Sequence, residues 1–519
     1  MVVVIPVQDQ DNFMRILFIF LALIGVNRSI AQNDLDAIRY SRLGTGGSAR
    51  YMAMGGAFGA LGADLSCSST NPGALGLYKK GEFMFASGLR FTHNQGEISG
   101  KKTTMSNANF VFNSIGIALV WKAEKDPESR HVVTFANNQL CNFSNTTRIA
   151  SNTNNNSIVK DMMNKAEGKT TKNLDYSYEG AAFNVFLIDT FYGKYFSFVD
   201  LKRTVKQTRD IETSGRANDL NFSYAYSSKD QFYFGMSLGI PKISYTSTTT
   251  HTELDEKDSM RVVITNTATQ SFTTTYIDGL PAYYPDKLGF NSLTYTEFFS
   301  TNGSGFNVKL GMVARINDLV RIGAYYHSPT IFNLTDTYYY NMAATFDADV
   351  KNPVLNKFPE EGGYYTYKII TPSRYGASAG FVLNKRAAIG LDYELIDYRK
   401  AKLVSKNVSD FAGVNAVINS KYSIGHNLRA GVEYNVQPVM LRLGYIMQGS
   451  PFGAAFSGDF VKHTISLGFG FRTKSDFYFD FAWQKSLSTE DYVFFSTIAQ
   501  KAKIKFDNSM LSATIGLKF

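Results

Sequence analysis

Six histidines are the residues whose ring nitrogens could hold a metal ion or transfer a proton in catalysis. They are scattered along the chain, and none lies beside a nucleophile or at a metal-ligand spacing. The stretch from Gly44 to Ala49, GTGGSA, matches the glycine pattern of a dinucleotide-binding loop. Such a loop follows a β-strand, and no strand pattern precedes Gly44, so we regard the match as accidental. We therefore expect no enzyme, no metal and no cofactor. The histidines are His93, His131, His251, His327, His426 and His463.

Eight charged residues fall on the polar face of segments that read as β-strands. An arginine or lysine among them would suit a ligand carboxylate, because guanidinium geometry allows two parallel hydrogen bonds. Alternatively, the two signs form a lattice of ion pairs that ties a wall to its interior. The basic residues are Lys309, Arg321, Arg429 and Arg442, and the acidic ones are Asp392, Glu394, Glu433 and Asp480.

The elements that position these charges follow a two-residue period from Glu82 to Phe519. Between Phe477 and Gln484, for example, every second residue is aromatic. We count about fourteen such segments, each near the ten residues that a tilted strand needs to cross a bilayer. The region from Asn142 to Asp219 departs from the period, and we expect an extracellular excursion between the third and fourth strands. It also has room for two further strands, which would give a barrel of about sixteen.

The composition of the two strand faces separates a membrane barrel from a soluble β-sandwich. One face carries Gly, Ser, Thr and charged residues, and the other carries large aromatics near both strand ends. This predicts an all-β, transmembrane antiparallel barrel with a polar lumen and a lipid-facing outside. Short connections such as Asn317-Asp318 alternate with long ones such as Thr252 to Asn291, as periplasmic turns and outer loops do. The chain ends on Phe519 in a final amphipathic strand, the type of signal that barrel-assembly machinery reads, so we expect the outer membrane.

Two segments precede the barrel, which we assign to residues 82–519. Residues 1–31 have the apolar run and small-residue end of a signal peptide, with Met14 as an alternative start. Residues 32–81 are predicted to form a hatch inside the lumen, because Leu43 to Leu77 is too rich in Gly and Ala for an exposed loop. Cys67, in this segment, either pairs with Cys141 or stays free.

The overall charge gives little reason to expect a nucleic-acid partner. The 519 residues carry a formal net charge of +9, spread along the chain without a block of Lys and Arg. No later segment approaches twenty continuous apolar residues, so we expect no helical membrane span. We expect a monomer surrounded by outer-membrane lipids.

Several stretches together resemble the FadL/TodX family of outer-membrane transporters of hydrophobic compounds. The resemblance rests on GGSARYMAMGGAFGALGADLS, on Asn71-Pro72-Gly73, where the family usually has Asn-Pro-Ala, on Ser304 to Thr330 and on Leu428 to Phe452. It implies a fourteen-stranded barrel with an N-terminal hatch. It also implies passive uptake of long-chain fatty acids or other hydrophobic molecules, captured at outer loops and released sideways near the third strand. A general porin and a surface adhesion or haem-binding barrel remain the alternatives.

The third strand is the least regular of the predicted ladder. After Phe135 its alternation fails at three consecutive amides, Asn137, Asn138 and Gln139. Amides are poor lipid-facing residues, so we predict that this segment borders a lateral opening, opposite Asn71 to Gly73. The alternative is that the amides lie at the extracellular rim.

Overall fold

The computed structural model describes residues 34–519 apart from 43, 45, 125, 155–156, 192, 198, 202–203, 258–262, 267–270, 275–288, 348–350, 385, 454–459, 494 and 496–500. Residues 1–33, which hold the predicted signal peptide, lie outside this range. No helix in the described part is long and apolar enough to cross a membrane.

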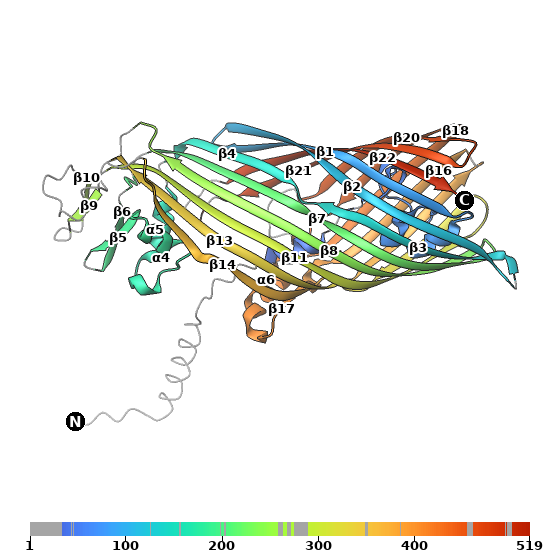
Figure 1. Cartoon of the computed structure of the whole chain (residues 1–519), viewed down its shortest axis with the longest axis horizontal. Coiled ribbons are helices and arrows are strands. Elements are labelled where there is room, and N and C mark those ends of the chain that lie inside the picture. Colours follow the sequence, from blue (N-terminus) through green and yellow to red (C-terminus); the bar gives the residue numbers. More distant parts are fainter. Residues whose placement is uncertain are drawn as a thin grey trace, which may run out of the picture.

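A closed barrel of 14 antiparallel strands forms the body of the molecule (Figure 1). Each strand pairs with the next along the chain, and β1 pairs with β22 to close the ring. The prediction of fourteen strands is therefore confirmed, and the alternative of sixteen is wrong. The strands are β1 (Glu82–Ile98), β2 (Lys101–Ala123), β3 (Asp126–Asn142), β7 (Val205–Ser228), β8 (Phe232–Leu254), β11 (Phe290–Arg315), β12 (Val320–His327), β15 (Arg374–Leu383), β16 (Ala387–Asp397), β18 (Ile424–Val436), β19 (Val439–Gln448), β20 (Lys462–Arg472), β21 (Phe477–Tyr492) and β22 (Ala502–Lys518).

Four further strands lengthen the wall rather than add to the ring. β13 (Ile331–Phe346) follows β12 beyond Pro329, and β14 (Val354–Ile370) precedes β15, from which Pro372 separates it. Proline has no N–H for the ladder, so it interrupts a strand at this point. β4 (Asn145–Asn154) extends β3, and β17 (Lys402–Val404) extends β16.

The outward face changes from apolar to polar along each long strand. On β8 the outward residues Phe234 and Met236 are 52% and 44% exposed, and the apolar series ends at Ile240. Beyond it, every second residue from Lys242 to Thr252 is polar. β11 has 26 residues, far more than the roughly ten that cross a bilayer, so the polar half of the wall stands clear of the apolar belt. The stretch from Asn341 to Gly363, which the pattern predicts as a long outer loop, therefore belongs largely to strands, because β13 includes 341–346 and β14 includes 354–363.

One end of the barrel, which we call the capped end, holds a small folded unit between β4 and β7 (left in Figure 1). Its apolar residues pack against inward residues of β11, β13 and β22, including Tyr295, Met342 and Ile504. Only the middle of the predicted excursion, Asn142 to Asp219, is thus a cap at the mouth, because residues 145–154 and 205–219 belong to the strands β4 and β7. It comprises α4 (Ile158–Ala166), η3 (Thr171–Asn173), α5 (Glu179–Asn184), β5 (Ile188–Phe191) and β6 (Lys194–Ser197). The remaining connections hold the hairpin β9 (Val263–Asn266) and β10 (Ser271–Thr274), together with η6 (Tyr398–Lys400), η7 (Val408–Phe411) and α6 (Ala412–Lys421).

The N-terminal residues 34–78, which we call the lumen segment, lie inside the barrel. Their hydrogen bonds reach strands far apart in the ring: Ala49 N–H donates to Thr514 Oγ1 on β22 at 2.7 Å, and Gly59 N–H to Asp392 on β16 at 3.1 Å. Nearly every residue from 47 to 76 is buried. The segment consists of α2 (Asp34–Ser41), α3 (Ala49–Ala53), η1 (Leu65–Ser69) and η2 (Pro72–Leu77).

Candidate functional site

The barrel wall is interrupted between β2 and β3. The two strands are paired from the rung of Ala123 with Asp126 to the rung of Ser114 with Asn138, and the ladder ends at this second rung. Beyond this rung, β2 pairs only with β1, and β3 pairs only with β7. Leu140 has no partner on β7, because Gln139 pairs with Asn218 and Cys141 with the next residue back, Ala217. This β-bulge bends β3 and ends its ladder with β2.

The lumen segment meets β3 at the bulge. Asn138, which is fully buried, accepts a hydrogen bond from Ser114 at 2.7 Å and donates to Ser68 and Ser69 at 3.1 and 3.0 Å. A Cβ atom on Gly46 would lie only 1.7 Å from the carbonyl oxygen of Gln139, so glycine is required for this approach. Asn138, one of the three amides predicted to border a lateral opening, therefore joins the wall to the lumen segment.

Two cavities lie on either side of the interruption and share three lining residues, Val111, Gln139 and Asn142. The inner cavity has a volume of about 170 Å³ and also touches Gly46 and Lys462. The outer cavity has a volume of about 600 Å³ and opens beside Phe110, which is 70% exposed. The three shared residues are what separates the lumen from the outer surface here. Asn137 lies outward and half-buried next to them.

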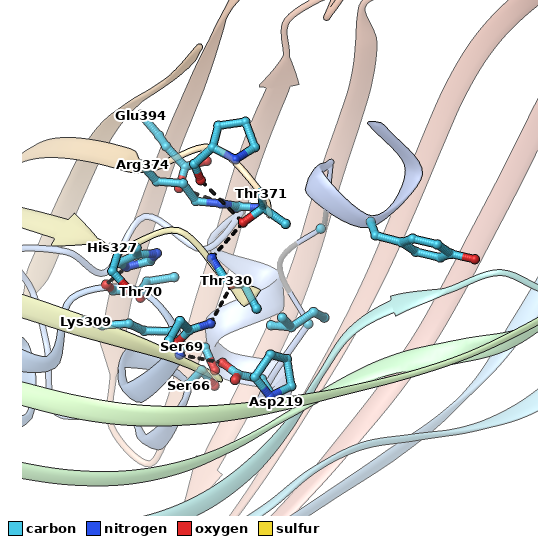
Figure 2. Close-up of a pocket in the computed structure, with 18 of the residues that line it drawn as sticks. Ser66, Ser69, Thr70, Asp219, Lys309, His327, Thr330, Thr371, Arg374 and Glu394 are labelled. Atoms are coloured by element: carbon cyan, nitrogen blue, oxygen red, sulfur yellow. Dashed lines mark hydrogen bonds and ion pairs between the residues drawn. The ribbon is translucent and has the colours of Figure 1, made fainter. Parts of the chain in front are cut away.

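A third pocket lies between the lumen segment and the wall, and most of the residues that line it are polar (Figure 2). Ser66, Ser69 and Thr70 approach it from the lumen segment. From the wall, His327 donates to the Thr70 carbonyl at 2.5 Å, assuming the Nε2–H tautomer. Its volume of about 50 Å³ holds a water or two rather than a lipid-sized ligand.

Three of the four basic residues predicted to touch a ligand carboxylate are held by acids. Lys309 Nζ lies 3.0 Å from Asp219, and Arg429 lies 3.1 Å from Glu394. Arg442 lies 2.7 Å from both Glu433 and Asp480. Arg321 instead donates to the Leu61 carbonyl at 3.1 Å. Charges in this arrangement favour the ion-pair lattice over a free carboxylate site. Asp392 contacts the lumen segment differently, by accepting a hydrogen bond from Gly59 N–H.

The turn at Asn71-Pro72-Gly73 docks on β8, β11 and β12. The Asn71 amide donates to the carbonyls of Gly59 at 2.6 Å and Met312 at 3.2 Å, and its oxygen accepts from Gly73 N–H at 3.0 Å. A Cβ atom on Gly73 would lie 2.6 Å from Met312 Cα, so the turn needs glycine at this point.

Wall glycines, which the sequence places at inward positions, provide the room for this turn. A Cβ atom on Gly311 would lie 1.9 Å from the Asn71 side-chain oxygen, and one on Gly235 would lie 2.2 Å from the Pro72 carbonyl oxygen. Asn138 therefore contacts Ser68 and Ser69. The sequence pattern instead predicts that Asn71 to Gly73 lie opposite it. The sequence signal for this docking site is the pair of inward glycines on β8 and β11.

Ligand capture at outer loops is expected of three Tyr- and Phe-rich stretches, and these differ in their placement: Tyr276 to Tyr284, Tyr338 to Phe346 and Phe452 to Phe456. Tyr276 to Tyr284 lie outside the described residues. Tyr338 to Phe346 belong to β13, where Met342 and Phe346 are buried beneath the cap. Phe452 packs against Tyr422 with the rings tilted by 38° and their centroids 5.2 Å apart. Both cysteines are free, which answers the question of whether Cys67 and Cys141 pair.

No protein-family model and no curated protein matches the sequence. Among solved structures, the chain is similar to a FadL homologue of Pseudomonas aeruginosa, with a TM-score of 0.55, 13% identity and coverage of 92% of this chain and 99% of the other. It is also similar to a deltaS2S3 mutant of TodX, the P. putida toluene transporter, with a TM-score of 0.50, 12% identity and coverage of 92% and 100%. At these identities the likeness concerns the fold.

Proposed function

From the FadL-type fold of this chain, we propose that it is a passive outer-membrane channel for hydrophobic small molecules, which leave its lumen sideways between β2 and β3. Long-chain fatty acids and aromatic hydrocarbons are substrate classes that fit the apolar side of the exit, which Phe110, Val111 and Phe112 of β2 form. One observation carries this proposal: the β2–β3 ladder stops at Ser114 and Asn138, and cavities on both sides of the wall meet there.

A gap in the ladder matters because a complete barrel wall offers no passage into lipid. Every backbone group in a closed barrel is hydrogen-bonded to a neighbour, so an apolar molecule inside it is cut off from the bilayer. At the gap, Phe110 and Phe112 line the outer cavity on the β2 side. An apolar molecule leaving there enters hydrocarbon without crossing water.

The lumen segment has the role of a hatch in this proposal. It fills the barrel between the capped end and the opposite mouth, and buried contacts such as that of Arg50 with Glu433 at 3.0 Å hold it in place. Axial flow of water and ions is thereby blocked, whereas the side exit stays available. Residues 32–81 are accordingly the hatch domain and 82–519 the barrel domain, with the capped end outside the cell.

Deleting Leu140 tests the exit. This residue is the extra member of the bulge, so its removal lets β3 continue the regular alternation and pair with the free edge of β2. Uptake of radiolabelled palmitate and of toluene by cells carrying the variant is expected to fall to the level of cells without the protein. Folding is checked by heat-modifiable migration in detergent gels.

Deleting Asn291 is the matched control. It is also the extra residue of a bulge, between Phe290 and Ser292 of β11, but it lies at the capped end, far from the gap. This variant is expected to take up both probes at the normal rate. Normal uptake by the folded Leu140 deletion variant would refute lateral release. Equal losses of uptake in the Leu140 and Asn291 deletion variants would show that shortening a strand, rather than closing the gap, lowers uptake.

A further inference from the structure

The outer cavity at the wall gap carries two basic side chains, Arg216 and Lys242, that form no ion pair with any acid among the described residues. We propose that this cavity binds the anionic phosphate headgroup of a membrane lipid, with an acyl chain against Phe110 and Phe112. The proposal concerns the outer side of the wall and holds whatever molecule the channel carries.

Strand register brings the two cations together. On the paired strands β7 and β8, Arg216 lies opposite Ser244 and Asn218 lies opposite Lys242, so the two cations are diagonal neighbours on one face. Diagonal neighbours are roughly 7–8 Å apart at Cα, which lets one phosphate contact both long side chains. Both residues are exposed and line the cavity.

The described surroundings of the two cations supply no competing anion. Within the described part of the chain, neither Arg216 nor Lys242 forms an ion pair, and the polar residues that line the cavity beside them are uncharged. The nearest acid on the outward face of β7 is Glu212, four residues and roughly 13 Å along the strand. The cavity is therefore positively charged. Its uncharged polar lining is Gln139, Asn142, Ser144, Asn218, Ser244 and Asn302.

The height of the two cations matches that of lipid phosphates. Arg216 lies four residues beyond Leu220, the last apolar outward residue of β7, and Lys242 lies two beyond Ile240 on β8. They therefore stand at the boundary between the apolar belt and the polar wall, where headgroups lie. A soluble anion would make no apolar contact with Phe110, whereas a lipid would pack its acyl chain against this side chain. Figure 1 shows β2, β3, β7 and β8 side by side along the same stretch of wall.

A lipid in this position would cover the bilayer side of Gln139 and Asn142. These residues separate the inner and outer cavities, so the bound lipid and an exiting molecule would occupy the same space. The headgroup would then act as a seal over the gap.

Native mass spectrometry of the full-length protein in detergent, titrated with phosphatidylglycerol and with zwitterionic phosphatidylcholine, tests the site. The double variant Arg216→Gln/Lys242→Gln is expected to raise the Kd for phosphatidylglycerol about 30-fold. Wild-type protein is expected to bind phosphatidylcholine more weakly.

The matched control is Lys368→Gln/Lys402→Gln. These exposed lysines are also diagonal neighbours, on β14 and β17, next to apolar Ile370 at the belt edge, but they do not line the cavity. Their removal is expected to leave the Kd unchanged.

The remaining outcomes would overturn the proposal. An unchanged Kd in the Arg216/Lys242 variant excludes the site, and equal losses in both variants indicate general surface charge. Inorganic phosphate or laurate that displaces phosphatidylglycerol at similar concentration would identify the occupant as a soluble anion or a carboxylate ligand rather than a lipid.

Discussion

The side-chain amide of Asn138 donates to Ser69 Oγ at 3.0 Å, which joins the last rung of the interrupted β2–β3 ladder to the lumen segment. Ser69 also accepts a hydrogen bond from Asn221 on β7 at 2.9 Å. One serine of the lumen segment therefore holds two neighbouring strands at the place where the wall opens.

Replacing Asn138 with leucine is expected to loosen this junction. The substitution removes the partner of Ser68, Ser69 and Ser114 in a buried site, at a cost of about 1–3 kcal/mol for each polar group left unsatisfied. The midpoint of heat-modifiable unfolding should fall. Asn137→Leu, next in the chain but outward and half-buried, should leave the midpoint near that of the wild type.

Deleting residues 43–77 is expected to leave a barrel that inserts but conducts ions steadily. The strands satisfy their own backbone hydrogen bonds, so the ladder does not need the lumen segment. Conductance in planar bilayers measures the effect, with the intact protein as the low-conductance reference. An intact barrel that gains no conductance would show that the segment is not the barrier.

Arg442→Met is expected to destabilise the barrel by about 3–5 kcal/mol, because it removes the short ion pair of buried Asp480 and leaves that carboxylate only the longer contact with Arg472 at 3.6 Å. Asp480, 2.7 Å from Arg442, has no exposed side-chain surface. Lys485→Met, which breaks a more exposed pair with Asp507, should cost at most about 1 kcal/mol. Urea unfolding in lipid bilayers compares the two variants, and similar losses would contradict a structural role for the inner ion pairs.

Cys67 is expected to resist alkylation in the folded protein. Burial raises the pKa of its thiol well above the ordinary value, so the reactive thiolate is scarce near neutral pH. Maleimide labelling at pH 7 to 9 should therefore be slow until the protein is denatured, and rising pH should accelerate it little. A Cys141→Ser background assigns the label, and rapid labelling of folded protein would show that the lumen segment leaves its place.

Local alternation was enough to predict the strands, their number and the side that faces lipid. The aromatic series from Phe477 to Trp483 determines its outward face whatever strand it pairs with, because successive side chains always point to opposite faces. The loss of alternation after Phe135 also located the irregular part of β3 without knowledge of its neighbours.

Tertiary structure decided which residues meet, because contacts across a barrel depend on strand register and on the path of the lumen segment. Arg442 and Asp480 lie 38 positions apart and pair only through the register of β19, β20 and β21. Arg216 and Lys242 become neighbours in the same way, so no local sequence motif indicates that the two side chains are close. The turn at Asn71 meets β11 instead of β3 because wall glycines admit its backbone there, and such shape complementarity is formed only in the closed barrel.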